Sequence, residues 1–327
     1  MLMILEQATK YLLLTVWIVA FFSSKGTAQT CSCAGAPLLG AQSSAPVFGG
    51  DLLIGLSHEY HDISRLYVNG ELVENESTFR TTQSTLLEVH YGLSAKLSLS
   101  GTFTYVRKYR QTGLQTQNPQ SLTVSGVGDG LLLLKYKLFN RLKPPSLQAT
   151  IGSGLKIPLG SFDIRNNGFL LNADMQPGTG AWDGIVWSEL TSSFDSSFPL
   201  NLFLITSYRF TGSSERFGTN DIYQFGNELI TTAGGSTSLG EKIGYTAVLQ
   251  YRSTSSDKRN GVPQPNTGGY WVSHISKLSY SINDRYSAHI DGRIPLTQEL
   301  NGLQPTTSYA ISFSFFVNLS KRLERIY

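Results

Sequence analysis

The sequence predicts an all-β protein: a closed antiparallel transmembrane β-barrel of about twelve strands that follows an N-terminal signal peptide. Three observations favour this fold class. Short segments after residue 50 alternate apolar with polar or small residues, which is the period of a two-faced strand. The connections between these segments alternate between long and short. The chain also begins with an apolar run of the length found in secretion signals.

The N-terminus has the order of regions expected of a secretion signal. Lys10 precedes the apolar run YLLLTVWIVAFF, and the small, polar stretch SSKGTA follows it. Gly26 and Ala28 occupy the small-residue positions before a signal-peptidase cut, and the apolar run is short for a spanning helix, which needs about 20 residues. The divisions we expect are a signal peptide over 1–28, a periplasmic Cys-containing segment over 29–48, the barrel over 49–320 and a tail over 321–327.

The predicted strands have a side-chain period of two. In the last of them Tyr309, Ile311 and Phe313 fall on one face, and the residues between them are small or polar. Each segment has about 10 to 13 residues, which suffices to cross a membrane at a tilt. We expect strands near residues 50–60, 79–91, 97–109, 127–139, 147–158, 180–192, 200–211, 222–234, 243–253, 269–281, 286–295 and 308–319.

The connections between these strands alternate in length. The first, third and fifth run roughly over 62–78, 110–126 and 159–179, whereas the second, fourth and tenth are short and lie at 92–96, 140–146 and 282–285. Outer-membrane barrels have this asymmetry, with long loops outside the cell and short turns in the periplasm. The pattern therefore predicts the outer membrane of a Gram-negative bacterium, where outer-membrane lipids would contact the apolar strand faces.

Ionisable side chains occupy the strand faces opposite the apolar ones. Twelve strands enclose a lumen too wide for Leu and Phe side chains to fill, so a soluble barrel with an apolar centre is disfavoured. A membrane barrel inverts the arrangement, with apolar faces toward lipid and polar faces toward a hydrated interior. The side chains that we expect to line the lumen are Glu88, Asp129, Lys135, Lys137, Lys156, Glu228, Arg252, Asp291 and Arg293. The same faces also carry His90, Asp183, Glu189, Arg209, Lys277 and His289.

Asp129, Lys135 and Lys137 fall in one predicted strand, and two interpretations stay open. They form a constriction that selects solutes by charge, or they belong to a structural ladder of salt bridges, which the mixed signs favour. Neighbouring glycines precede no predicted helix, so they lack the geometry of a phosphate-binding loop, and glycine in barrel strands more often relieves curvature. These glycines are Gly126, Gly128, Gly130, Gly152 and Gly154. The formal charge of +3 gives no indication of a nucleic-acid partner, and no cofactor is predicted.

Three segments of the chain resemble one known family. The stretch GVGDGLLLLKYKLF over residues 126–139, the stretch GLKIPLG over 154–160 and the hairpin over 91–97 are similar to outer-membrane barrel proteins linked to the meta-pathway of phenol degradation, which are related in style to the fatty-acid channel family. The resemblance implies passage of small, often hydrophobic molecules through the outer membrane and brings no catalytic residues. On this basis we expect an outer-membrane channel or transporter rather than an enzyme.

Cys31 and Cys33 lie just after the expected signal-peptidase cut. Paired thiolates suit soft metals such as Cu(I) or Zn, although two ligands do not complete a zinc site. The alternatives are a contact for a periplasmic partner, a redox pair, a local disulfide and two inert residues. The stretch CSCAGAP over residues 31–37 lies outside the family pattern and is similar to the Cys-rich start of transporters from Bacteroidetes-like bacteria.

Two other functions stay open beside the channel. The first is a non-conducting structural or binding barrel with a plugged lumen. The second is an outer-membrane lipid hydrolase that uses a lipid-facing His58 or His274 with a serine. Such an enzyme needs a nucleophile, a base and an orienting group within hydrogen-bond reach. Ser273 and Ser276 flank His274, but adjacent strand residues point to opposite faces, and the sequence holds no Gly-x-Ser-x-Gly motif.

Overall fold

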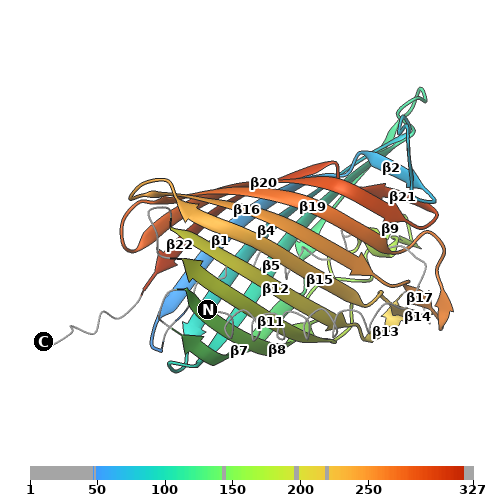
Figure 1. Cartoon of the computed structure of the whole chain (residues 1–327). Helices are drawn as coiled ribbons and strands as arrows, with labels where there is room; N and C mark the ends of the chain where they lie inside the picture. Colours follow the sequence, from blue (N-terminus) through green and yellow to red (C-terminus); the bar gives the residue numbers. More distant parts are fainter. Residues whose placement is uncertain (1–46, 48, 142–144, 195–198, 218–220, 320–327) are drawn as a thin grey trace, which may run out of the picture.

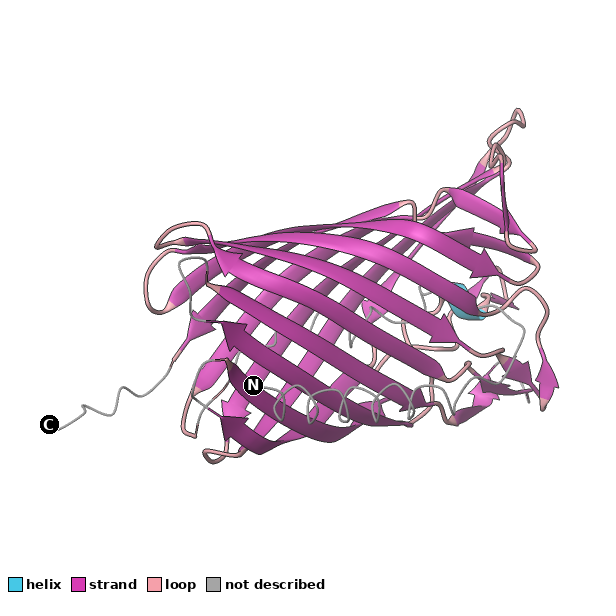
Figure 2. Cartoon of the chain, in the orientation of Figure 1, coloured by secondary structure: helices cyan, strands magenta, loops and turns pink. Residues whose placement is uncertain are grey.

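The computed structural model describes residues 47, 49–141, 145–194, 199–217 and 221–319. In this part of the chain strands and loops dominate, and the helical element is the short 3-10 helix η1 (Ala173–Met175) (Figure 2). No helix there is both long enough and apolar enough to cross a membrane. The expected signal peptide, the segment with Cys31 and Cys33, and the tail over 321–327 fall outside the described residues, apart from Val47.

The wall strands close into one antiparallel barrel of twelve strands, which confirms the predicted fold class (Figure 1). Each strand pairs with its neighbours along the chain, and β1 pairs with both β4 and β22, so the sheet has no free edge at the closure. β6 and β7 are two halves of one wall strand. In chain order the wall contains β1 (Leu52–Asp62), β4 (Thr78–Gly92), β5 (Leu97–Thr112), β6 (Gln120–Val127), β7 (Gly130–Arg141), β8 (Ser146–Ile157), β11 (Asp183–Phe194), β12 (Leu200–Phe210), β15 (Glu228–Ser238), β16 (Ile243–Thr254), β19 (Gly269–Ser281), β20 (Tyr286–Leu300) and β22 (Tyr309–Asn318).

Three predicted strands differ from the observed ones. The strand predicted near 127–139 is the second half of a longer strand that breaks at Gly128 and Asp129, and its first half, β6, occupies much of the predicted third loop. The strand predicted near 222–234 divides into β14 (Asp221–Gln224), which lies in a loop, and β15. The division falls at Gly226, where a Cβ would lie only 1.8 Å from the Ser255 carbonyl oxygen. β20 continues to Leu300 rather than ending near residue 295.

The long connections carry small sheets of their own, and all of these lie at one end of the barrel, toward the right of Figure 1. Asn–Gly pairs at 69–70, 167–168 and 260–261 have positive φ at both residues, the geometry that tight hairpin turns require. The loop strands are β2 (Arg65–Val68), β3 (Glu71–Val73), β9 (Arg165–Asn166), β10 (Phe169–Leu170), β13 (Ser213–Phe217), β14, β17 (Lys258–Arg259), β18 (Val262–Pro263) and β21 (Leu303–Thr306). The short turns lie at the opposite end, as the alternation of connection lengths predicts.

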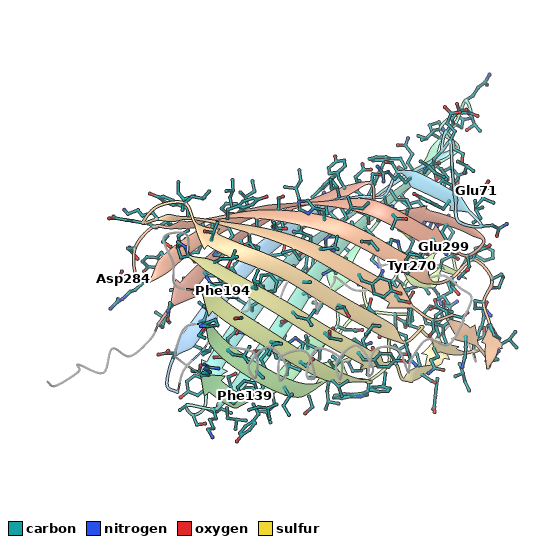
Figure 3. All side chains as sticks on the ribbon, in the orientation of Figure 1. Glu71, Phe139, Phe194, Tyr270, Asp284 and Glu299 are labelled. Atoms are coloured by element: carbon teal, nitrogen blue, oxygen red, sulfur yellow. The ribbon has the colours of Figure 1, made fainter. Side chains whose placement is uncertain are left out.

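The apolar strand faces point outward. Phe103 is 51% exposed and Phe313 is 57% exposed, although both are large apolar side chains, whereas polar residues of the alternate register such as Thr102 and Ser312 are buried. Aromatic side chains gather near both ends of the wall. Figure 3 shows Tyr270 toward the loop-bearing end and Phe194 toward the end with short turns. Apolar faces outside and polar faces inside are what a barrel in a lipid bilayer with a polar interior requires.

The interior also holds an apolar cluster, which the sequence analysis did not predict. It consists of Leu131 and Leu133 on β7 and Ile185 and Trp187 on β11. β8 runs between these two strands, and its glycines leave room for the cluster. A Cβ on Gly154 would lie 2.9 Å from Leu133 Cδ1 and 2.3 Å from the Leu132 carbonyl oxygen. Packing therefore explains these glycines more directly than the curvature that we expected.

A first prediction concerns Gly154. The change Gly154→Ala adds a methyl group where backbone and Leu133 already lie within contact distance, so it should destabilise the folded barrel by about 1–3 kcal/mol. The measurement is the urea midpoint of the refolded protein, followed by heat-modifiable gel mobility. The matched control is Gly292→Ala, because a Cβ there meets no atom within 4 Å. Equal midpoints for the two variants would contradict the packing role.

Candidate functional site

Ionised side chains of alternating sign run around the inner wall from the break in the fourth wall strand to β16. Lys156 Nζ lies 3.0 Å from Asp129 Oδ2 and 3.0 Å from Asp183 Oδ2. Arg209 lies 3.7 Å from Asp183 and 3.0 Å from Glu228. We call this set the charge ladder: Asp129, Lys156, Asp183, Arg209, Glu228 and Arg252. Because every charge has a neighbour of opposite sign, none of them is left buried and uncompensated.

The charge ladder ends on an aromatic contact. Arg252 Nε donates to Glu228 Oε1 at 2.5 Å, and the Arg252 guanidinium also lies over the Trp271 ring at 4.7 Å from its centroid. Trp271 Nε1 donates in turn to Thr306 Oγ1, and Thr306 Oγ1 donates to Gln298 Oε1. The ladder is therefore tied to β21 in the loop above β20. Strand alternation predicts Arg252 in the lumen but gives no indication of Trp271 or Thr306, because nothing in the sequence identifies their cross-strand partners.

The remaining predicted lumen residues lie on the inner face but outside this ladder. Asp129 pairs with Lys156 and not with Lys135 or Lys137, which lie further along the same wall strand toward the short turns. Glu88 is fully buried and accepts a hydrogen bond from Ser57 Oγ at 3.4 Å. Two more of the predicted residues, Asp291 and Arg293, are half-buried on β20.

A long loop over residues 158–182 lies against the inner side of the wall, and we call it the inner loop. The Asp129 carboxylate accepts hydrogen bonds from the backbone N–H of Gly160 at 3.2 Å and of Thr179 at 3.0 Å. The Thr179 hydroxyl donates to the same carboxylate at 2.7 Å. On the opposite side Lys108 Nζ donates to the carbonyl oxygens of Asp174 and Gln176, each at 2.8 Å. Two buried charges on different strands therefore hold the inner loop in place.

The inner loop covers a gap in the hydrogen-bond ladder of the wall. β6 pairs with β5 alone, whereas β7 pairs with both β5 and β8. β8 ends at Ile157, opposite Gly130, so β6 has no second partner strand among the described residues. We call the place between β6 and the end of β8 the wall gap. Val124 on β6 packs there against Leu171 and Met175 of the inner loop.

Glycines let the inner loop approach the wall gap closely. A Cβ on Gly126 would lie 3.3 Å from Pro177 Cγ, and a Cβ on Gly160 would lie 2.7 Å from the Gly178 Cα. A Cβ on Gly128 would lie 2.3 Å from Thr104 Oγ1. The glycines of the GVGDG stretch thus allow the backbone of the loop and the wall to meet, which a side chain at these positions would prevent.

A cavity of roughly 610 Å³ opens among the long loops at the same end of the barrel, and we call it the vestibule. Leu66, Leu170, Leu171 and Leu303 contribute apolar surface. An aromatic ledge forms one side. The Phe217 and Tyr223 rings stack with centroids 4.7 Å apart, and Phe225 meets Tyr223 edge-on at 5.0 Å. This volume lies in the range of small-molecule sites, and the lining mixes apolar side chains with polar and charged ones.

One ionisable group lies buried beneath the aromatic ledge. Asp257 Oδ2 accepts a hydrogen bond from the Tyr223 hydroxyl at 2.6 Å, and Oδ1 accepts one from the Gly226 N–H at 2.8 Å. Burial raises the pKa of Asp257 from its usual 3.8 to about 7, and these hydrogen bonds offset only part of that rise. The vestibule therefore contains a carboxyl group that titrates near neutral pH.

The predicted metal and hydrolase residues do not form a site in the described residues. Cys31 and Cys33 fall outside them, so a soft-metal site or a partner contact there stays a prediction. Over the described ranges no three His, Cys, Asp or Glu side chains are grouped to hold a metal ion. His58 Nδ1 lies 3.0 Å from Thr85 Oγ1. His274 Nε2 lies 2.9 Å from Ser276 Oγ, on the lipid-facing side of β19, and its hydrogen bonds in this part of the chain include no carboxylate.

The fold and its inverted faces define an outer-membrane β-barrel protein of a Gram-negative bacterium. The family described as putative MetA-pathway of phenol degradation matches residues 68–315, and the chain belongs to this family. This agrees with the resemblance found from the glycine-rich motifs. The likeness of the Cys31 region to transporters of Bacteroidetes-like bacteria has no support in these comparisons. None of the curated protein sequences matches the chain significantly.

Solved structures share the barrel at low sequence identity. The COG4313 outer membrane channel from Pseudomonas putida F1 is 15% identical, with a TM-score of 0.66 over 86% of this chain and 98% of that chain. The transport unit of the autotransporter AIDA-I from Escherichia coli is 9% identical, with a TM-score of 0.46 over 86% of this chain and 92% of that chain. A FadL homologue of Pseudomonas aeruginosa is 10% identical, with a TM-score of 0.42 over 90% of this chain and 98% of that chain. At such identity the first of these supports the fold alone.

A second prediction tests the anchor of the inner loop. Asp129→Ala removes the acceptor of the Gly160 and Thr179 N–H groups, so trypsin should cleave the exposed Arg165 of the inner loop about tenfold faster. The assay is limited proteolysis of the refolded protein, with gel mobility as the check that the barrel is intact. The control is Asp163→Ala, since Asp163 is an exposed carboxylate of the same loop. An unchanged rate for Asp129→Ala would mean that other contacts hold the loop.

A third prediction concerns the pH dependence of the vestibule. Because the pKa of Asp257 is raised to about 7 in the fold, the folded vestibule keeps a proton that the opened loop releases above its usual 3.8. The resulting stability is full below that lower value and is lost as the pH rises through about 7. Hydrogen exchange of residues 221–226, taken relative to Asp257→Asn at each pH, should rise on the order of a hundredfold between pH 5 and pH 8.

The matched control is Asp221→Asn, because Asp221 is an exposed carboxylate whose pKa is lowered by hydrogen bonds from Asn260 and Arg259. The exchange of wild-type protein relative to this control should stay flat from pH 5 to pH 8, since Asp257 titrates in both proteins and its effect cancels. A ratio to Asp257→Asn that stays flat from pH 5 to pH 8 would contradict the raised pKa.

Proposed function

We propose that the protein is an outer-membrane channel that admits small hydrophobic molecules at the vestibule and releases them sideways through the wall gap into the membrane. Membership of the phenol-degradation family supports the channel class. The observation that carries the route is the position of the wall gap. The wall gap lies directly beside apolar residues of the inner loop. The charge ladder begins next to it, with the ion pair between Asp129 and Lys156.

The vestibule offers an apolar solute several side chains to contact. Its leucines and aromatic ledge remove apolar surface from water, at about 25 cal/mol per Å² of buried area. Leu171 belongs both to the vestibule lining and to the apolar cluster beneath the wall gap. Packed apolar side chains therefore connect the vestibule to Val124. Val127, three residues further along β6, is exposed on the outer face.

The axial route offers an apolar solute much less. Passage along the lumen would bring it past paired ions such as Lys156 with Asp183, which keep their hydrogen bonds only with polar neighbours or water. A hydrophobic molecule gains no dispersion or desolvation energy there. The charge ladder therefore favours the wall gap as the exit for such a solute, and leaves the axis to water and ions.

The alternatives differ from the channel in what crosses the membrane. A non-conducting barrel gains some support from the inner loop, because Lys108 and Asp129 hold it across the interior. That barrel would bind a solute at the vestibule without passing it on. A lipid hydrolase has less support, because His274 and Ser276 lack an orienting carboxylate among their hydrogen bonds in the described part of the chain. A partner or soft metal at Cys31 and Cys33 remains a separate proposal.

Uptake of toluene by cells with a lipopolysaccharide outer leaflet tests the proposed function, because that leaflet slows the entry of apolar molecules. The double change Phe217→Ser with Phe225→Ser should lower the initial uptake rate about tenfold, since two aromatic contacts of about 0.5–1.5 kcal/mol each are lost. The control is Phe169→Ser, because Phe169 is an exposed loop aromatic that does not line the vestibule. Uptake no faster than in cells without the protein would favour the non-conducting barrel.

The route needs its own comparison. Arg252→Gln removes one charge of the ladder and one ion pair with Glu228, so it should change the ion current through a planar bilayer but leave toluene uptake unaltered. A loss of toluene uptake as large as that of the vestibule variant would mean that the solute crosses the ladder, and the lateral exit would be wrong.

A further inference from the structure

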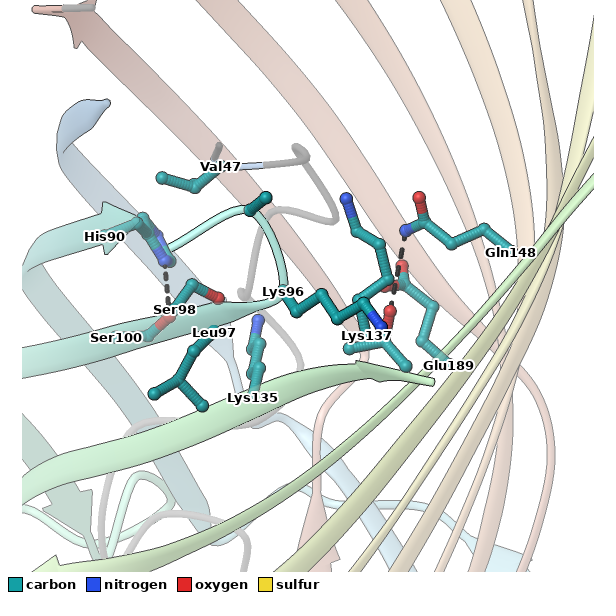
Figure 4. A pocket seen from close by; sticks show the side chains of 12 residues that line it. Val47, His90, Lys96, Leu97, Ser98, Ser100, Lys135, Lys137, Gln148 and Glu189 are labelled. Carbon is teal, nitrogen blue, oxygen red and sulfur yellow. Dashed lines mark hydrogen bonds between the residues drawn. The ribbon is translucent and has the colours of Figure 1, made fainter. Parts of the chain in front are cut away.

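A second pocket lies at the other end of the barrel, next to the short turns (Figure 4). It is small, about 40 Å³, and its lining is polar. Lys96 comes from the turn between β4 and β5, Lys135 and Lys137 from β7, and Glu189 from β11. Figure 4 shows these side chains with Gln148 around one space inside the wall. We call it the lysine pocket.

Two of its charged groups, Lys135 and Glu189, are buried and attract each other through space, but they form no hydrogen bond with each other. Lys135 is 9% exposed, and its Nζ lies 4.5 Å from the centroid of the Trp187 ring, but it makes no hydrogen bond or ion pair within the described ranges. Glu189 is 9% exposed, and its Oε1 is buried with no hydrogen-bond partner among the described residues. A buried ion that lacks a hydrogen bond costs several kcal/mol, so both groups favour a ligand that supplies one.

The local packing fixes Lys135 in this position. The Trp187 ring lies beneath its ammonium group, and Gly152 on β8 leaves the space for both, because a Cβ there would lie 3.4 Å from Trp187 Cε3 and 3.5 Å from Lys135 Cγ. The nearby His90 is engaged elsewhere, with Nδ1 at 2.9 Å from Ser100 Oγ and Nε2 at 3.4 Å from Glu88. Packing therefore holds Lys135 in the pocket, whereas Lys96 is exposed on its turn.

The charges of the lysine pocket indicate the kind of ligand. Three lysines and one glutamate line it, which leaves an excess of two positive charges when His90 is neutral. A small anion would give Lys135 the hydrogen-bond acceptor that it lacks among the described residues. A simple anion would leave Glu189 Oε1 unbonded and would add repulsion to it, whereas a ligand with a hydroxyl group can donate a hydrogen bond to that oxygen.

We propose that the lysine pocket binds a small hydroxycarboxylate at the periplasmic end of the barrel. The ligand carboxylate accepts hydrogen bonds from Lys135 Nζ and from the ammonium group of Lys96. The ligand hydroxyl donates to Glu189 Oε1. This site lies at the opposite end of the wall from the vestibule and the wall gap, and it does not depend on the route proposed for hydrophobic solutes.

Lactate and propionate are matched probes for this site, because they differ in the single hydroxyl group. Isothermal titration calorimetry of the refolded full chain in detergent should give saturable lactate binding and propionate binding about tenfold weaker, as expected for one charge-assisted hydrogen bond. Lys135→Met should weaken lactate binding about tenfold or more. Lys242→Met is the control, because Lys242 is an exposed lysine of another short turn and does not line the pocket.

A second variant separates the hydroxyl contact from simple charge attraction. Glu189→Met removes the acceptor, so lactate and propionate should bind with affinities within about twofold of each other, and propionate should bind more tightly than to the wild-type protein. Heat-modifiable gel mobility verifies that each variant is folded. The absence of saturable lactate binding to the wild-type protein would overturn the proposal, and so would equal wild-type affinities for lactate and propionate. Neither result would bear on toluene uptake, which reports on the vestibule.

Discussion

In hydrocarbon, a backbone N–H or C=O group that finds no partner within the protein stays unpaired, and each one costs several kcal/mol. The closure of β1 onto β4 and β22 meets this demand around almost the whole wall. It fails at β6, which pairs on one side alone in the described structure. The inner loop packs against β6 at this unpaired edge. Much of the remaining architecture follows from holding the loop there.

Holding the inner loop requires buried charges, and buried charges require partners. Asp129 takes the backbone N–H groups of Gly160 and Thr179, and its charge is balanced by Lys156. Lys156 also pairs with Asp183, and ion pairs of this kind continue from strand to strand around the wall. The series ends where the Arg252 guanidinium lies over the Trp271 ring. The charge ladder is thus a consequence of the wall gap as well as a filling of the lumen. The charge ladder therefore links the stability of the wall to the wall gap, through which we propose the solute leaves.

Alternation within strands gave the fold class, the barrel inversion and the face of each ionisable residue, because the side-chain period of two needs no knowledge of the neighbours. The same parity places His274 and Ser276 on one face, where they are in contact. Alternation within strands does not predict which residues pair between strands. Asp129 meets Lys156 rather than Lys135, and this depends on register and on the break at Gly128. The break between β6 and β7 occurs where Asp129 binds the inner loop. Apart from the glycines, the local sequence therefore does not predict it.

The two ends of the barrel differ in the side chains that line their pockets. At the loop-bearing end the vestibule and the wall gap share apolar residues, notably Leu171, and an apolar solute can stay out of water between them. At the end with short turns, Lys135 and Glu189 attract each other through space but form no hydrogen bond with each other. This arrangement suits a ligand that carries both an anionic group and a hydrogen-bond donor. The charge ladder stands between these regions. A solute that favours one end gains nothing from the other, so a single barrel can keep two ligand chemistries apart without any moving domain.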